Sequence, residues 1–373
     1  MLCHEAGYAM KKKSIFLVLI LLVLTILSSF YVVGGTQAYS HYQQSILEDQ
    51  QHCGGQAPVR ICVRAPTAIF SAFYPSYVST QYPLFTIDYS SSEPLTLILS
   101  VTVTHFSQTQ THTVNATTGT QSSTFIPAQL EQALAKLTLE TNTALHVEVK
   151  DTRGHSYYVD DIALLLHSRW LMQWTTLNRL KIAAWVTPGA PSIAKLVTKA
   201  TAHLKDQEAP VPAAMVGYNG ATPQQVMDQV DAIYDTLWKD YHIHYIQASV
   251  PYSATALPAD NTAMQTVKLP AEVLQQHSGM CIELTALLAA AVERIGLHAE
   301  IVIIPGHAFL GVALTSDNKQ FQYWDAVDVN NNVAADSAMT AANNLYSQNE
   351  KQHTIIDTIL ISDARNTHIG PMF

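Results

Sequence analysis

The feature that most constrains this chain is the run GMCIELTALLAAAVERIGL, residues 279–297, which places a cysteine at the start of an apolar helix. Apolar residues recur there at helical spacing, and Gly296 ends the pattern. The residues expected to be buried are Leu284, Leu287, Leu288, Ala291, Val292 and Ile295. Cys281 lies in the first turn, where unpaired backbone N–H groups favour a thiolate over a thiol.

Two strands that follow this helix carry a histidine and an aspartate. The segment AEIVIIPGHAFLGVAL predicts a strand, a Pro-Gly break, and a second strand that begins at His307. The chain then returns through QFQYWDAVD, where Asp328 follows a third strand. The helix and the two neighbouring strands can bring Cys281, His307 and Asp328 to one point.

The small effect of a helix N-terminus on a thiol pKa shows why Cys281 needs a histidine nearby. A free thiol has a pKa of about 8.5, and a helix N-terminus contributes only about 0.3–1 kcal/mol, at best about 2. Because one pKa unit corresponds to about 1.36 kcal/mol, the helix alone shifts the thiol by about one unit. An imidazolium partner would complete the activation, and an aspartate would orient the ring. Attack by such a cysteine on a carboxamide gives a thioester, which water or an amine resolves.

These motifs resemble the transglutaminase-like branch of the papain-like cysteine enzymes, over roughly residues 220–335. The resemblance assigns Gly279 and Cys281 to the family's Gly-x-Cys, His307 to its histidine, and Trp324 with Asp328 to its Trp-x-x-x-Asp. It implies an α+β fold with an antiparallel sheet packed on the cysteine helix. Asp325 lies in the same motif and is the alternative acid of the triad. The family includes cross-linking enzymes, amide hydrolases and non-catalytic members.

Other residues have weaker expected roles at this site. The N–H of Cys281 is a natural donor to an oxyanion, and Gln265 is a candidate side-chain donor. Trp324 either shields the His–Asp pair or simply packs in the core. His242 and His244 share one face of a strand, but no third ligand accompanies them, so we expect no metal. The chemistry requires no metal and no organic cofactor.

The sequence of the N-terminus predicts the cellular compartment of the protein. Three lysines, Lys11–Lys13, precede an uncharged run over 14–33 that is long enough to cross a bilayer. We therefore expect a single-pass cell-membrane protein with a transmembrane signal anchor over 14–34 and an extracytoplasmic bulk. The alternative is secretion after signal-peptide cleavage near Ala38. In that oxidising location Cys53 and Cys62 could form a disulfide.

The remaining pattern divides the chain into further parts. Residues 60–168 read as mostly β, with Leu97, Leu99, Val101 and Val103 on one face of a strand and a turn at Asp151–Gly154. The predicted fold class is α+β, with an N-terminal transmembrane helix, an immunoglobulin-like β-sandwich and a transglutaminase-like domain. The predicted boundaries are 1–13 for a cytoplasmic tail, 14–34 for the anchor, 35–59 for a stalk, 60–175 for the sandwich and 180–373 for the last domain.

Charge excludes one class of partner. The chain has a formal net charge of −9 and only 13% charged residues, which argues against binding nucleic acid through its phosphates. The sequence therefore predicts an exported cysteine enzyme that acts on amide bonds of proteins or peptides, with hydrolysis favoured. A cross-linking transglutaminase and a non-catalytic surface module are the alternatives.

Overall fold

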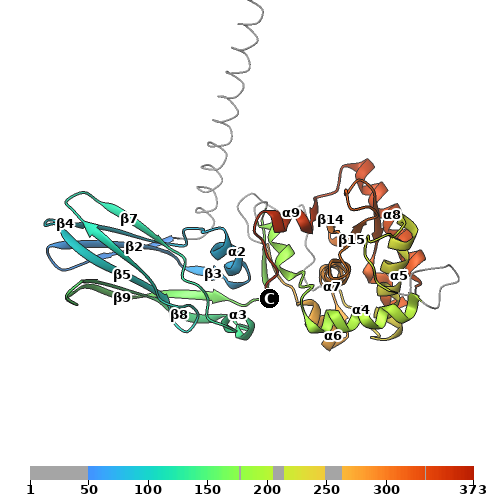
Figure 1. Cartoon of the computed structure of the whole chain (residues 1–373), viewed down its shortest axis with the longest axis horizontal. Helices are drawn as coiled ribbons and strands as arrows, with labels where there is room; N and C mark the ends of the chain where they lie inside the picture. The colour runs from blue at the N-terminus through green and yellow to red at the C-terminus, as the bar shows by residue number, and fades with distance from the viewer. Residues whose placement is uncertain (1–48, 176–177, 205–213, 248–262, 332) are drawn as a thin grey trace, which may run out of the picture. The chain divides into compact units, whose positions relative to one another are not determined.

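Two β-sheets make up the first part of the described chain (Figure 1). The computed structural model describes residues 49–373 except 176–177, 205–213, 248–262 and 332. One sheet has the strand order β1-β2-β4-β7, and the other has the order β3-β9-β8-β5-β6. The bounds of the first sheet are β1 Asp49–Gly54, β2 Val59–Pro66, β4 Phe85–Ser91 and β7 Gln121–Phe125. Those of the second are β3 Ala68–Phe70, β5 Leu95–Val103, β6 Gln110–Ala116, β8 Thr141–Asp151 and β9 Ser156–His167.

Alternating side chains explain why these segments are strands with one buried face. Along β5 the expected set is fully buried: Leu97, Leu99, Val101 and Val103 are each 0% exposed. The predicted turn between β8 and β9 is confirmed, because the N–H groups of Arg153 and His155 donate to Asp151 and Gly154 has a φ of 88°. Short helices lie among these strands: η1 Ser71–Phe73, α2 Tyr74–Ser79 and α3 Ala133–Lys136.

The first sheet begins inside the range predicted as a stalk. Strand β1 pairs with β2, so part of 35–59 belongs to the sheet. Cys53 on β1 and Cys62 on β2 are joined by a disulfide.

The predicted fold class needs one correction. Among the described residues, no helix is long and apolar enough to cross a bilayer. The most apolar of these helices, α7 over Cys281–Arg294, has 14 residues, which span roughly 21 Å against the roughly 30 Å of a bilayer core. The described fold is therefore α+β without the expected transmembrane helix. The segments 1–13 and 14–34 lie outside the described residues.

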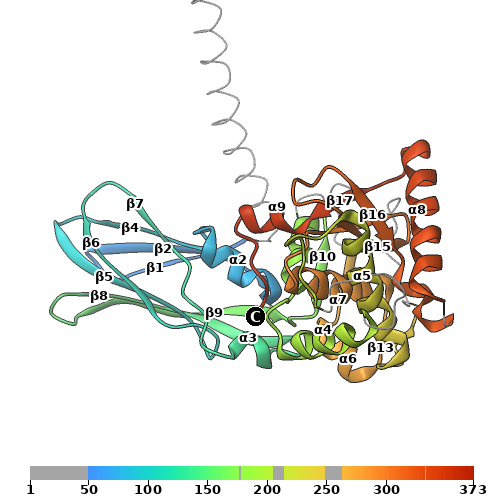
Figure 2. The same ribbon diagram turned by 45° about the vertical axis from the view of Figure 1, so that its right-hand side comes forward.

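The second part of the chain is built around helix α7 and a four-stranded sheet of order β16-β15-β14-β17 (Figure 2). All its strand pairs are antiparallel. The strands are β14 Ala299–Ile304, β15 His307–Ala313, β16 Phe321–Trp324 and β17 Asp357–Leu360. The helices are η2 Arg179–Trp185, α4 Pro191–Leu204, α5 Pro223–Lys239, α6 Pro270–Gln276, η4 Ala326–Asn331, α8 Ala335–Gln352 and α9 Ile361–Asn366. Two short sheets pair β10 Leu171–Trp174 with β12 Ala263–Thr266, and β11 His244–Tyr245 with β13 Ser278–Gly279.

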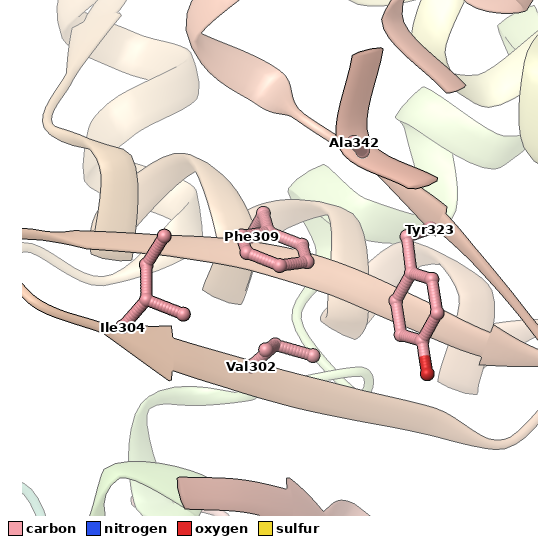
Figure 3. Packing of buried hydrophobic residues seen from close by; sticks show 5 residues of the cluster. All are labelled: Val302, Ile304, Phe309, Tyr323 and Ala342. Atoms are coloured by element: carbon pink, nitrogen blue, oxygen red, sulfur yellow. The ribbon is translucent and has the colours of Figure 1, made fainter. Parts of the chain in front are cut away.

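Both faces of the four-stranded sheet are covered, which explains why its strands are apolar without alternation. Helix α7 packs on β14 and β15, and α8 packs on β16. Figure 3 shows one of the resulting core clusters, formed by Val302, Ile304, Phe309, Tyr323 and Ala342. This covered sheet is a rigid support for the residues at its ends.

Helix α5 begins with a capping box. Thr222 accepts a hydrogen bond from the N–H of Gln225, whose side chain accepts one from the N–H of Thr222. Pro223 follows in the first turn, where a missing N–H costs nothing.

Candidate active site

Cys281 is the first residue of α7, as the sequence predicts. Glu283, only 1% exposed, accepts from the N–H of Met280 at 2.9 Å and from the N–H of Lys268 at 2.7 Å. Burial raises the pKa of Glu283, whereas these backbone hydrogen bonds and the charge of Lys268 lower it. Glu283 is thus a stabiliser of the helix end.

Two further contacts fix the position of the cysteine. Thr285, one turn along α7, donates to the carbonyl oxygens of Cys281 at 2.8 Å and Ala308 at 3.2 Å, which ties the helix to β15. Gly279 leaves room for this packing, because a Cβ there would lie 3.0 Å from Leu284 and 3.2 Å from Val273. The glycine of the Gly-x-Cys motif therefore has a steric reason.

His307 follows a two-residue turn between β14 and β15. Ile304 pairs with His307, and Pro305 and Gly306 form the turn. The positive φ of Gly306, 72°, and the restricted φ of proline fit a type II turn. The side chain of His307 is 19% exposed. A tight turn at this place delivers the imidazole to the end of the sheet beside Cys281.

The aspartate that contacts His307 is Asp325, the residue directly after β16. His307 Nε2 and Asp325 Oδ2 are 2.8 Å apart, and Asp325 Oδ1 accepts from the N–H of Val327 at 3.1 Å. The sequence favours Asp328 as the acid of the triad, with Asp325 as the alternative. Asp328 lies one turn further, in η4, and its side chain is outside the described residues.

His307 also hydrogen-bonds the side chain of Cys281. Burial acts to lower the pKa of His307, but its hydrogen bonds to Asp325 and Cys281, together with their negative charges, outweigh burial and raise the pKa to about 10. The arrangement therefore favours an imidazolium between two anionic partners.

Gln265, the candidate side-chain donor to an oxyanion, lines the same pocket as Cys281. Its Oε1 accepts from Trp174 Nε1 at 2.9 Å, and its Nε2 lies 3.9 Å from the sulfur of Met280. The amide nitrogen is therefore next to the first turn of α7.

Trp324 lies in the core next to Asp325. It is fully buried, and its indole N–H donates to Asp231 of α5 at 2.7 Å. Burial raises the pKa of Asp231 to about 7, while the bond to Trp324 and the charges of nearby aspartates have smaller effects. Tyr234 on the same helix donates to the backbone carbonyl of Asp325 at 3.4 Å. Helix α5 thus holds the chain on which the acid lies.

A pocket opens at Cys281 and His307. Its lining is mostly apolar or uncharged and consists of Trp174, Tyr245, Gln247, Gln265, Cys281, Ile282, Ile303, Gly306, His307 and Ala308. Burial raises the pKa of Tyr245, and the charges of Cys281 and Asp325 raise it further. Trp174, Tyr245 and Gln247 are not among the site residues predicted from the sequence. Nothing in the sequence marks Trp174, because it lies 107 residues before Cys281.

The histidine pair considered as a metal site does not share one strand. His244 is on β11, whereas His242 lies before this strand and is exposed with a positive φ of 47°. In the part of the chain that the structure describes, no group of three His, Cys, Asp or Glu side chains is placed to hold a metal ion.

Comparison with known families agrees with this geometry. Residues 259–356 match the model of the Transglutaminase-like superfamily, so this segment is a transglutaminase-like domain. It contains Cys281, His307 and Asp325, and its limits lie somewhat later in the chain than the expected core of 220–335. Domains of this type are suited to cysteine-dependent acyl transfer or hydrolysis. No curated protein matches the chain.

Proposed function

We propose that this protein is an exported cysteine enzyme that attacks amide bonds of proteins or peptides through Cys281, His307 and Asp325. The observation that carries the proposal is the single histidine that contacts both the cysteine at a helix N-terminus and a buried aspartate. The uncharged pocket wall beside these groups suits a neutral carboxamide.

The proposed reaction starts from a thiolate and an imidazolium. The sulfur of Cys281 attacks the amide carbonyl carbon, and the carbonyl oxygen becomes an oxyanion. The N–H of Cys281 and the amide of Gln265 are the donors proposed to stabilise it. As the C–N bond breaks, His307 gives its proton to the leaving amine and leaves a thioester. Asp325 stabilises the charged imidazole and keeps its orientation.

Hydrolysis is the favoured second half of the reaction. Water attacks the thioester while His307 takes its proton, which releases a carboxylic acid and restores the cysteine. Cross-linking would replace water by an amine. Water is always present, and no residue of the pocket lining marks a site for an amine, so we propose the hydrolase over the transferase.

The disulfide between Cys53 and Cys62 supports export. A disulfide such as Cys53–Cys62 is typical of an oxidising compartment outside the cytoplasm. Under this proposal the substrate is an extracytoplasmic protein or peptide.

The pH dependence of Cys281 alkylation by iodoacetamide tests the proposal on the full-length protein. Mass spectrometry of the Cys281 peptide gives the rate in wild type and in His307→Ala. The matched control is His146→Ala, which removes a histidine that also pairs with an aspartate, at 2.8 Å, but lies on β8. We expect a thiol pKa below about 8.5 that rises only in His307→Ala.

Two results would contradict this function. A slow thiol with an ordinary pKa, unchanged by loss of His307, would make the domain a non-catalytic binding module. Incorporation of a labelled amine at a rate above hydrolysis would make the protein a cross-linking enzyme instead.

A further inference from the structure

One wall of the pocket comes from a strand outside the transglutaminase-like segment. Strand β10 runs antiparallel to β12, with Met172 opposite Gln265 and Trp174 opposite Ala263. Trp174 is 2% exposed and lines the pocket with Cys281. A residue that precedes the matched segment 259–356 by more than 80 positions thus contributes to the site.

The indole of Trp174 decides which way the amide of Gln265 faces. An indole N–H only donates, so the atom 2.9 Å from Trp174 Nε1 must be the amide oxygen. The NH₂ group must then point away from Trp174, toward the sulfur of Met280 at 3.9 Å. Reversing the amide would set two donors against each other in a buried contact.

The strand that carries Gln265 is held at the same helix end. Glu283 accepts with one oxygen from the N–H of Lys268, two residues after β12, and with the other from the N–H of Met280. The ammonium of Lys268 also donates to the carbonyl oxygen of Ser278 at 2.7 Å. These hydrogen bonds and the pairing of β12 with β10 set where Gln265 lies, and Trp174 sets the orientation of its amide.

We infer that Trp174 is a positioning residue that turns the Gln265 N–H toward the oxyanion formed at Cys281. The inference rests on the proposed function and adds a residue to it. The N–H of Cys281 has no acceptor within its own helix, because it belongs to the first turn. A carbonyl oxygen bonded next to Sγ would then meet two donors, one from α7 and one from β12.

Two reactions of Cys281 separate this role from a merely structural one. With p-nitrophenyl acetate, sulfur attacks the carbonyl carbon, an oxyanion forms, and its collapse expels p-nitrophenolate and leaves an acetyl thioester. With iodoacetamide, sulfur displaces iodide at a saturated carbon, so no oxyanion forms. Only the first reaction needs the amide of Gln265.

The experiment measures both rates on the full-length protein in Trp174→Phe, Gln265→Ala and the double variant. Removing one oxyanion donor costs about 100- to 1,000-fold, and misorienting it costs less, so we expect Trp174→Phe to acylate about 10- to 100-fold more slowly. Its alkylation rate stays at the wild-type value. Because both residues act through one amide, the double variant is no slower than Gln265→Ala.

The matched control is Trp170→Phe. Trp170 precedes β10 in the same segment, and its indole N–H donates to Glu272 at 2.8 Å rather than to Gln265. We expect this variant to acylate at the wild-type rate, which would show that losing an indole donor nearby is not enough.

The outcomes distinguish this inference from the proposed function. Wild-type acylation with an equal rate in Trp174→Phe, a multiplicative double variant, or equal slowing of acylation and alkylation would overturn the role of Trp174 and leave the cysteine enzyme standing. A wild-type thiol that neither acylates nor shows a lowered pKa would overturn both.

Discussion

The two-sheet region and the region around α7 differ in how they bury charge. Six carboxylates are buried among the described residues, and only Asp151 belongs to the two sheets. Its partners are the N–H groups of Arg153 and His155, two and four residues along the chain. Asp325 and Asp231 have side-chain partners on other elements, His307 and Trp324, which are 18 and 93 residues away.

This difference separates buried carboxylates with a local structural role from those that can take part in chemistry. A buried carboxylate whose partners come from its own turn completes a local hydrogen-bond pattern. One whose partner comes from another element depends on the whole fold, and it can change the pKa of that partner. The region around α7 contains the second kind, and the proposed active site lies there.

Asp325→Asn should have the largest effect. An amide cannot stabilise the imidazolium as a carboxylate does, so the pKa of His307 falls below about 10 and acylation of Cys281 slows by about 1,000-fold, or about 4 kcal/mol. NMR titration of His307 and the p-nitrophenyl acetate rate measure the two effects. Asp328→Asn is the matched control and should change neither; the reverse result would return the role of the acid to Asp328.

Lys181→Met tests a buried cation beside the two-sheet region. Lys181 is 8% exposed, and its ammonium lies 4.6 Å from the ring centre of Phe73 and 4.7 Å from that of Tyr77. Burial lowers its pKa from 10.5 to about 7. Between these values the unfolded chain binds a proton that the folded chain lacks, so wild-type stability rises with pH across this window.

In Lys181→Met this rise should disappear, and the variant should be more stable than wild type by about 3 kcal/mol near pH 7. Urea unfolding near pH 7 and near pH 10 measures the free energy of unfolding of both proteins. An equal dependence of stability on pH in both proteins would mean that the ammonium of Lys181 is solvated in the folded state.

Glu300→Gln tests a buried carboxylate away from the proposed active site. Gly311 lies opposite Glu300, and a Cβ there would come within 2.6 Å of the Glu300 side chain, so the glycine provides the space that this carboxylate occupies. Burial raises the pKa of Glu300 to about 7, and its hydrogen bond with Tyr323 offsets part of this effect.

Because the pKa of Glu300 is raised in the folded state, its contribution to the stability of the wild type is fully present below about pH 4.5. That contribution is lost as pH rises through 7. Glu300→Gln should remove the fall and be more stable by about 2 kcal/mol above pH 8, as measured by urea unfolding. Glu148→Gln on β8 is the control for a partly exposed carboxylate and should leave the pH dependence unchanged. A wild type with a flat profile would contradict the raised pKa.

Thr285→Val should have the smallest effect. The variant keeps the shape of the side chain but leaves the carbonyl oxygens of Cys281 and Ala308 without this donor, at a cost of about 1–2 kcal/mol in the free energy of unfolding. In the two-sheet region, Thr102 donates to Thr109 at an exposed position, and Thr102→Val should stay within about 0.5 kcal/mol. Equal costs at the two threonines would remove the contrast between the regions.

Local patterns in the sequence predicted several elements of this protein. The apolar period placed α7 and its start at Cys281, and the Pro-Gly pair placed the turn before His307. Alternation likewise predicted the buried face of β5. Each of these depends on residues within a few positions of one another, so the chain itself carries the signal.

Only the tertiary structure chose the partner of His307 and oriented the amide of Gln265. Asp325 and Asp328 are three residues apart in one motif, and the sequence cannot say which carboxylate meets an imidazole on another strand. Trp174 reaches Gln265 across 91 positions through the pairing of β10 with β12. Hydrogen bonds of this kind depend on distance in space, to within a few tenths of an ångström, and spacing along the chain does not determine it.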